Sequence, residues 1–322
     1  MSSHLSSRTV TPVSAQVPAG DPVGALEAAA WALAAMIGTL RDAVTAPLPD
    51  VLAAAPQRTA VLEAAGLVGR DHGAFTVHPS LRLGQPLAQW KLSSLRRAVA
   101  AAAGDGNGAT DGGWAGQDDE VLLGQGRASG ATGRMLATKI VPELTGLAAR
   151  LNVAGSRVLD VGTGVAAIAV ALARAFPRAQ VVGIDILDRA LDLARREIAS
   201  AGDVAGRVSL RKLNVADLTE QATYDLIWLP APFLAEAALQ AGLPRVAEAL
   251  VPGGWLVAGT NPASGDALIG AVGRWTAALN GGNAYDTGWM AASQAALGLR
   301  EMRTLPTVTG GPVLLAARRP ER

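Results

Sequence analysis

A group of residues in the middle of the chain has the types and spacing needed to hold a nucleotide-like cofactor. Gly162 and Gly164 follow the apolar run "RVLDV", and Asp185 closes the next apolar run, "QVVGID". This order predicts a strand, a glycine turn, a helix and a second strand. The turn would let a ligand approach the helix N-terminus, and the carboxylate could accept hydrogen bonds from ribose hydroxyls. Together with Ala167, the glycines satisfy the dinucleotide pattern G-x-G-x-x-A, so a nicotinamide cofactor is one interpretation.

Asp160, two residues before Gly162, favours a different kind of cofactor. A carboxylate at the carboxyl end of the first strand would repel a pyrophosphate, but it could attract an ammonium group directly or through water. A cofactor with an amino group therefore fits better. The glycine pattern alone leaves both cofactors open.

The elements around this turn predict a doubly wound α/β domain. Nearly continuous apolar strands alternate with amphipathic helices, which is typical of a parallel sheet covered on both faces. The chain closes with a helix at 287–300 and two strands at 301–308 and 312–319, whose short link makes them antiparallel if they pair. The preceding strands are expected at 157–162, 180–186, 208–215, 224–229 and 254–259, and the helices between them at 166–176, 188–202 and 234–250.

The segment "DVGTGVA" resembles the first motif of the class I S-adenosylmethionine-dependent methyltransferases, an acidic residue followed by x-G-x-G-x-G, with Ala166 in place of the third glycine. "LNVADL" and "AEALVPGGWLVAG" are similar to two further motifs of that family, and the terminal strand pair resembles its usual sheet order. The resemblance covers roughly Val121 to Arg318. It implies S-adenosylmethionine as cofactor and S-adenosylhomocysteine as product, in preference to a nicotinamide nucleotide.

The resemblance also implies roles for single residues. The glycines would line the methionine part, Asp160 the amino group and Asp185 the ribose diol, with Ile186 packed on the adenine. Residues 214–217 would border the adenine ring. The segment "LLGQGRASG" could cover the cofactor carboxylate, or it could be an ordinary loop entering a helix capped by Ser129. The predicted cofactor-binding residues are Gln125, Arg127, Asp160, Gly162, Thr163, Gly164, Asp185, Ile186, Asn214, Val215, Asp217, Trp228 and Leu229.

The acceptor region after the fourth strand departs from the motifs of related enzymes. Small-molecule O-methyltransferases, which the chain resembles, often use a histidine here as general base, but "YDLIWLPAPFLAEAAL" contains none. "LPAPF" also differs from the Asn/Asp-Pro-Pro-aromatic motif of amide and amine N-methylating members, because Leu229 stands at the polar position. We therefore expect methyl transfer to a flat or hydrophobic small molecule, at oxygen, mainly by proximity and orientation. Glu236 and Tyr285 are candidate catalytic residues, and the predicted acceptor wall is Trp228, Phe233, Tyr285 and Trp289, although a single aromatic is more often a core or interface residue.

The N-terminal part predicts a separate, mostly helical domain. Residues 1–20 suit a disordered tail, 21–103 a winged-helix-like dimerisation and lid domain, 104–119 a glycine-rich linker and 120–322 the methyltransferase domain. A winged helix could instead bind DNA, but its recognition section has only Arg58 and Arg70 as cations. A methyltransferase-like protein that binds the cofactor without catalysing transfer is a third alternative.

Composition narrows the partners. The chain has 322 residues, 50% of them hydrophobic, a net charge of +1, no cysteine and three scattered histidines. Thiol chemistry is excluded, and neither a metal site nor binding to nucleic acid is expected. The N-terminus lacks a signal peptide and the apolar runs are interrupted, so we expect a cytoplasmic protein without membrane contact, as a homodimer by family resemblance.

Overall fold

The computed structural model describes residues 21–103, 113–261, 265–279, 281–305, 307 and 313–321. The chain divides into two compact units between His78 and Pro79. The predicted tail at 1–20 and most of the predicted linker at 104–119 lie outside the described residues.

The first unit contains three helices and a hairpin: α1 (Pro22–Asp42), α2 (Leu48–Ala54), α3 (Pro56–Ala64), β1 (Val68–Asp71) and β2 (Ala74–Val77). Asp21 caps α1 by accepting hydrogen bonds from the backbone N–H groups of Val23 and Gly24. Leu40, Leu52 and Leu62 are buried, one from each helix. The mostly helical content of this unit agrees with the sequence prediction. The winged-helix assignment itself stays a prediction.

Helix α1 is more exposed than its amphipathic pattern indicated. Its C-terminal half buries Ile37 and Leu40, but Leu26 and Trp31 are 61% and 68% exposed. Among the described residues, α1 is the one helix long and apolar enough to cross a membrane, with a mean hydropathy of 1.6. Length and composition alone also fit a packing helix of a soluble protein.

Helix α4 (Gly84–Ala103) belongs with the second unit, although the sequence analysis assigned it to the N-terminal domain. It packs along α5 (Asp119–Met135) through polar contacts. Ser93 donates a hydrogen bond to Gln125, and Arg96 forms an ion pair with Glu120 at 2.9 Å. These contacts tie α4 to α5.

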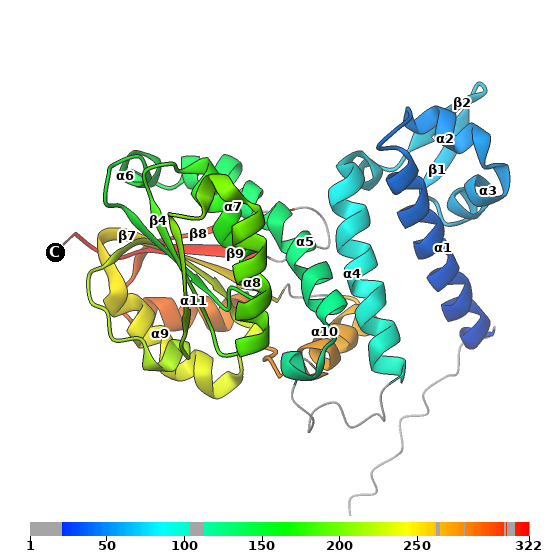
Figure 1. The fold of residues 1–322 in the computed structure, drawn as a ribbon. Helices are drawn as coiled ribbons and strands as arrows, with labels where there is room; N and C mark the ends of the chain where they lie inside the picture. The colour runs from blue at the N-terminus through cyan, green and yellow to red at the C-terminus, as the bar shows by residue number, and fades with distance from the viewer. Residues whose placement is uncertain are drawn as a thin grey trace, which may run out of the picture. The chain divides into compact units, whose positions relative to one another are not determined.

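The second unit contains a seven-stranded sheet in the order β5-β4-β3-β6-β7-β9-β8 (Figure 1). The first five strands in this order are parallel, and β9 pairs antiparallel with both neighbours. This confirms the doubly wound sheet and the inserted terminal strand. The strands are β3 (Arg157–Val161), β4 (Gln180–Asp185), β5 (Val208–Lys212), β6 (Tyr224–Pro230), β7 (Leu250–Thr260), β8 (Arg300–Leu305) and β9 (Val313–Arg318).

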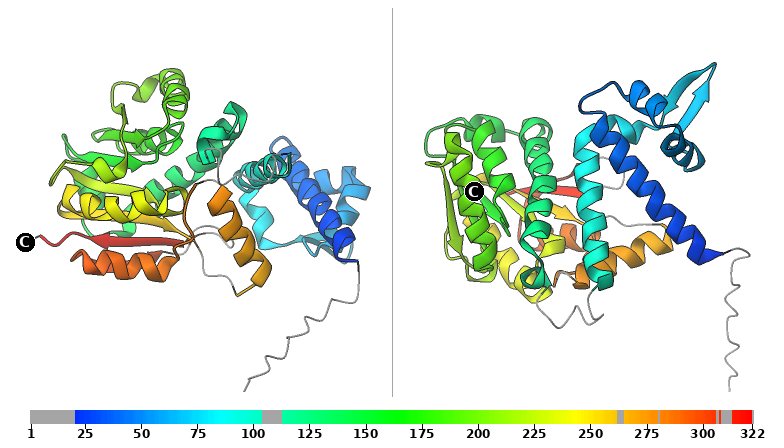
Figure 2. Two further views of the ribbon diagram at one scale, coloured as in Figure 1. Left: turned by 90° about the horizontal axis from the view of Figure 1, so that it is seen from below. Right: turned by 45° about the vertical axis from the view of Figure 1, so that its right-hand side comes forward.

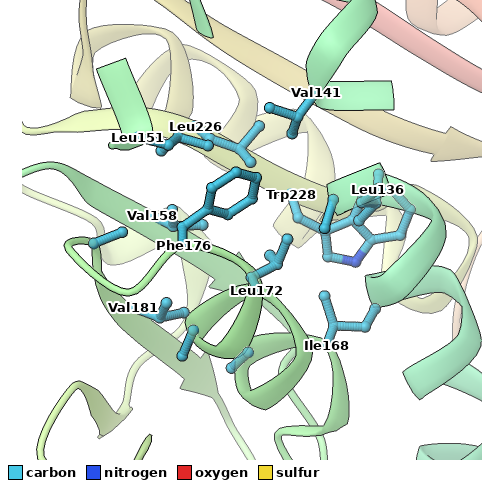
Figure 3. Packing of buried hydrophobic residues seen from close by; sticks show 14 of the residues in the cluster. Leu136, Val141, Leu151, Val158, Ile168, Leu172, Phe176, Val181, Leu226 and Trp228 are labelled. Atoms are coloured by element: carbon cyan, nitrogen blue, oxygen red, sulfur yellow. The ribbon is translucent and has the colours of Figure 1, made fainter. Parts of the chain in front are cut away.

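Side chains alternate between the two faces along each strand, so buried apolar side chains lie on both faces. Helices therefore cover both faces of the sheet. One core lies under α6 (Leu147–Leu151), α7 (Ala167–Ala175) and α8 (Asp188–Ser200), and Figure 3 shows part of it. The opposite core lies under α9 (Glu236–Ala249) and α11 (Thr287–Ala296). In Figure 2 the orange helix α11 runs along the red strand β9. The sequence analysis did not include α10 (Ala267–Leu279).

Candidate functional site

The predicted glycine turn joins β3 to α7. Gly162, Gly164 and Ala166 all have positive φ angles, of 60°, 55° and 64°. Glycine adopts this conformation freely, whereas alanine does so at a cost. No heavy atom lies within 4 Å of the position that a Cβ on Gly164 would take, so the turn is open there. The turn thus leaves its backbone accessible to a ligand at the carboxyl end of the sheet.

Asp185 holds the turn from the neighbouring strand. Its Oδ2 accepts a hydrogen bond from Gly164 N at 2.8 Å, and its Oδ1 accepts one from Leu187 N at 3.0 Å. Burial raises the pKa of this carboxyl, and the backbone hydrogen bonds oppose the rise. A carboxylate has about four acceptor positions. Asp185 therefore keeps acceptor capacity for the hydroxyl groups of a ribose.

Asp160 lies beneath the turn and is only 1% exposed. Its Oδ2 accepts a 2.7 Å hydrogen bond from Oγ1 of Thr163, which in turn packs on Gly183, where a Cβ would lie 2.7 Å from the same Oγ1. Burial raises the pKa of Asp160 to about 7, opposed mainly by the Thr163 hydrogen bond. Both side chains support the turn from inside, and their predicted contact with the cofactor stays a prediction.

A cavity of about 250 Å³ opens beside the turn. It contains Ile186, which is 58% exposed and was predicted to pack on adenine, together with the next residue, Leu187. The full lining is Trp114, Ala115, Leu122, Ile186, Leu187, Asp188 and Arg189. An exposed apolar side chain directly after Asp185, the carboxylate predicted to bind ribose, fits an adenine ring. The sequence analysis missed Trp114, which follows the glycine-rich segment and belongs to no recognised motif.

The predicted adenine-bordering residues 214–217 lie at the same end of the sheet, since Leu213 N donates to Asp185 O at 3.0 Å. Asn214 accepts a hydrogen bond from Ala216 N and so caps the short helical turn Val215–Asp217. Val215 is buried against Gly242 of α9, whereas Asp217 is exposed. Within this group, Asp217 is therefore the charged side chain free to approach a ligand.

The segment with Gln125 and Arg127 is helical, which corrects the expectation of a loop ending at a cap on Ser129. Gly126 of this helix lies close to the glycine turn, because a Cβ there would overlap Val165. Gln125 is hydrogen-bonded to Ser93 and Ser129, and Arg127 is exposed. Helix α5 thus lies directly against the turn.

The end of β6 separates two of the predicted site residues. Trp228 lies in the α7-side core among Leu136 and Ile168 (Figure 3), and Leu229 lies in the opposite core. Both side chains are almost fully buried, and the predicted contacts of Leu229 with the cofactor and of Trp228 with cofactor and acceptor stay predictions. Phe233 is 38% exposed, and its ring meets Trp114 edge to face at 5.6 Å.

The two catalytic candidates are in direct contact. Tyr285 OH donates a 2.6 Å hydrogen bond to Oε1 of Glu236, and Gln240 donates to the same Tyr285 oxygen at 2.5 Å. The hydrogen bond to Glu236 raises the pKa of Tyr285. Trp289 stacks on the Tyr285 ring with centroids 3.7 Å apart. The sequence analysis named these residues singly, and the structure brings them together.

Asn283 connects this cluster to the end of β6, and it belongs to no motif recognisable in the sequence. Its Nδ2 donates to the carbonyl oxygens of Ala231 and Leu234 at 2.7 and 2.8 Å, and its Oδ1 accepts from Tyr285 N at 3.0 Å. The side chain is buried. It therefore fixes the Tyr285 loop beside the expected acceptor position. Among the described residues, no group of three or more His, Cys, Asp or Glu could hold a metal ion.

Comparisons with known proteins agree with this geometry. The family described as "Methyltransferase domain" matches residues 158–254. A release factor glutamine methyltransferase from Rhodopirellula baltica is 35% identical over 103 residues, 32% of this chain and 34% of that protein. The chain thus spans about a third of the length of the curated relatives that it matches first.

Solved structures are similar over nearly the whole chain. The S-adenosylmethionine-dependent methyltransferase SibL in its apo form has a TM-score of 0.64 at 20% identity, covering 92% of this chain and 98% of its own. Human N-acetylserotonin methyltransferase, in complex with S-adenosylmethionine, has a TM-score of 0.58 at 14% identity, covering 92% and 95%. The residues of the turn, Asp185 and the adjoining cavity fit S-adenosylmethionine. Residues 158–254 therefore match a methyltransferase domain, and the chain has the fold of these S-adenosylmethionine-dependent methyltransferases.

Proposed function

We propose that the enzyme transfers a methyl group from S-adenosylmethionine to an oxygen atom of a small, largely apolar acceptor. The observation that carries this proposal is the apolar character of the segment after β6. Phe233 is partly exposed there and contacts Trp114, while Leu229 is buried. Such a surface favours a flat or hydrophobic ligand with few hydrogen-bonding groups.

The sequence similarity to glutamine methyltransferases supports a different acceptor, a glutamine in a protein. An amide acceptor needs polar partners, because an unpaired buried amide costs free energy. Leu229 stands where amide-methylating relatives of this fold carry a polar residue, and its side chain is packed in the core. We therefore favour the small molecule, and a protein glutamine is the second candidate.

The chain's own residues would mainly bind and orient. S-adenosylmethionine supplies an electrophilic methyl group when bound. The turn around Gly164 and the carboxylate of Asp185 would hold the cofactor, and Phe233 would orient the acceptor beside it. Holding two reactants in a near-attack geometry can supply much of the rate enhancement. The Glu236 carboxylate, bonded to Tyr285 OH, could take up the proton of an acceptor hydroxyl.

Calorimetric titration and an acceptor screen test this function. We expect S-adenosylmethionine and S-adenosylhomocysteine to bind, with NADH and NADPH as controls that do not. Purified enzyme with S-adenosylmethionine would then be incubated with aromatic hydroxy compounds and, separately, with a release factor, and the products examined by mass spectrometry. Methylated hydroxy compounds support the proposal. Methylation of the release factor at glutamine alone would overturn the small-molecule assignment, and no product from either set would favour a non-catalytic protein.

A double variant tests the proton acceptor. Glu236→Gln with Tyr285→Phe keeps the size of both side chains but removes the carboxylate and the hydroxyl. If this pair takes up the acceptor proton, kcat should fall by about 10²-fold or more, with little change in cofactor affinity. Unchanged turnover would leave proximity as the whole mechanism.

The quaternary structure and the remaining partners are also proposals. We propose a cytoplasmic homodimer that binds neither nucleic acid nor membrane. Light scattering on the full chain should give twice the monomer mass of 32.7 kDa. A salt-dependent mobility shift with duplex DNA, or sedimentation with lipid vesicles, would contradict the expected partners.

A further inference from the structure

Trp114 is placed on a supporting cluster at the edge of the cofactor cavity. It lies in the short 3-10 helix Gly113–Gly116 and packs on three buried side chains, Leu122 of α5, Val165 of the glycine turn and Leu193 of α8. These three belong to different elements that also surround the turn. The position of the indole is therefore set by the same packing that sets the turn.

The indole lies between two regions that the reaction must bring together. On one side it lines the 250 Å³ cavity with Ile186 and Leu187, which follow Asp185 directly. On the other side its ring meets Phe233 edge to face, with centroids 5.6 Å apart and an interplanar angle of 69°. Phe233 follows β6, where we expect the acceptor. Trp114 is thus a wall common to the cofactor cavity and the acceptor region.

The indole N–H adds an independent observation. Nε1 of Trp114 is buried and has no hydrogen-bond partner among the residues that the structure describes. A buried donor without a partner is unfavourable, and buried indoles usually find one, as Trp255 does with the carbonyl oxygen of Thr145 at 3.2 Å. Trp228 also has an unpaired N–H, but it lies in the core and not at the cavity. Among the residues that the structure describes, only Trp114 combines an unpaired donor with a position in the cavity wall.

We propose that Trp114 packs against the adenosine part of the cofactor and donates its indole N–H to it, and that the other edge of the same ring supports Phe233 at the acceptor position. This inference rests on the proposed binding of S-adenosylmethionine in this cavity. It makes Trp114 a positioning residue that links the two substrates. Cofactor binding would fix the indole and, through it, the acceptor wall.

Calorimetric titrations with S-adenosylhomocysteine and 5′-methylthioadenosine test the contact. Trp114→Ala removes the ring and should weaken both ligands by about 100-fold, while Trp114→Phe keeps an aromatic ring, loses only the donor and should weaken both by about tenfold. The loss should be the same for the two ligands, because both contain adenosine. The matched control is Trp275→Ala on α10, a tryptophan that is 57% exposed and outside the cavity lining.

Thermal melts without ligand accompany the titrations, so that a folding defect is recognised. Equal affinities of wild type and both Trp114 variants would overturn the inference and leave the proposed function intact. A loss in Trp275→Ala as large as in Trp114→Ala would overturn it too. If the wild-type protein binds neither ligand, both the proposed function and this inference fail.

Discussion

Helix α5 approaches the glycine turn so closely that a single methyl group should disturb cofactor binding. A Cβ on Gly126 would overlap Cγ2 of Val165, which lies in the turn and is only 5% exposed. Gly130, one turn further along the same helix, offers a matched control. A Cβ there would lie 3.6 Å from Nη1 of Arg134 and 3.8 Å from Cβ of Ala167, which are ordinary contacts. The two glycines therefore differ in their surroundings and not in their helical conformation.

The magnitudes follow from two opposing effects. Replacing glycine by alanine inside a helix stabilises by about 1 kcal/mol. Inserting a methyl group into a well-packed site costs about 1–3 kcal/mol. Gly130→Ala should thus stabilise the protein by about 1 kcal/mol, and Gly126→Ala should be about 1–3 kcal/mol less stable than that control. Because Gly164, the neighbour of Val165, bonds Asp185, we also expect Gly126→Ala to weaken S-adenosylhomocysteine binding about tenfold, the equivalent of one hydrogen bond.

Urea unfolding and calorimetric titration of both variants measure these effects. A double-mutant cycle with Val165→Ala isolates the contact, since removing the valine methyls should restore most of the loss caused by Gly126→Ala, with a coupling energy of about 1–3 kcal/mol. If Gly126→Ala is as stable as Gly130→Ala and binds the ligand equally well, the close approach of α5 to the turn is not tight in solution and the reasoning is refuted.

Three further predictions concern the turn and the loop that supports the acceptor region. Asp185→Asn should weaken S-adenosylhomocysteine binding by about 100-fold in calorimetry. One backbone N–H would lose its acceptor, and the ribose would lose a charged acceptor. A loss of affinity under threefold would contradict this role. Burial holds the folded-state pKa of Asp160 at about 7, above its unfolded value of 3.8, so the native state keeps a proton that the unfolded state releases. The free energy of unfolding should therefore fall as pH rises from about 4 to about 7 and level off above, and Asp160→Asn should remove most of this slope in urea titrations at about pH 5 and about pH 8; an unchanged slope would assign it to other groups. Asn283→Ala deletes three hydrogen bonds and should lower the free energy of unfolding in urea by about 3 kcal/mol. A decrease below about 1 kcal/mol would show that other contacts hold the Tyr285 loop.

The fold and the cofactor turn were predictable because their signals are local. Alternating apolar strands and helices specify the sheet, and the spacing of Gly162, Gly164 and Asp185 predicts a tight turn with a carboxylate at the end of the next strand. Ala166 stands where the family's motif has its third glycine, and its positive φ of 64° is close to those of Gly162 and Gly164.

Other parts of the site depend on contacts between distant segments. Trp114 contacts Phe233, more than a hundred residues further along the chain, and Asn283 contacts Ala231, about fifty residues earlier. No local sequence pattern indicates such contacts. The burial of Trp228 in the core under α7 was also not predictable, because the sequence does not say which strand residues point toward that helix. The glycines of α5 suggested a loop, because the sequence does not show that Gly126 lies against Val165 of the turn, where a side chain would not fit.

The insertion of β9 between β7 and β8 also constrains how the sheet can form. Strands β7 and β8 do not pair with each other. One edge of β7 therefore stays unpaired until β9 has been synthesised and has docked. Leu314 and Ala316 complete one core, and Leu315 and Ala317 complete the other. A chain arrested before Val313 would expose an apolar strand edge on which a second nascent chain could pair, a route to aggregation during translation. The chain can therefore complete its sheet and both cores only after the last strand has been synthesised.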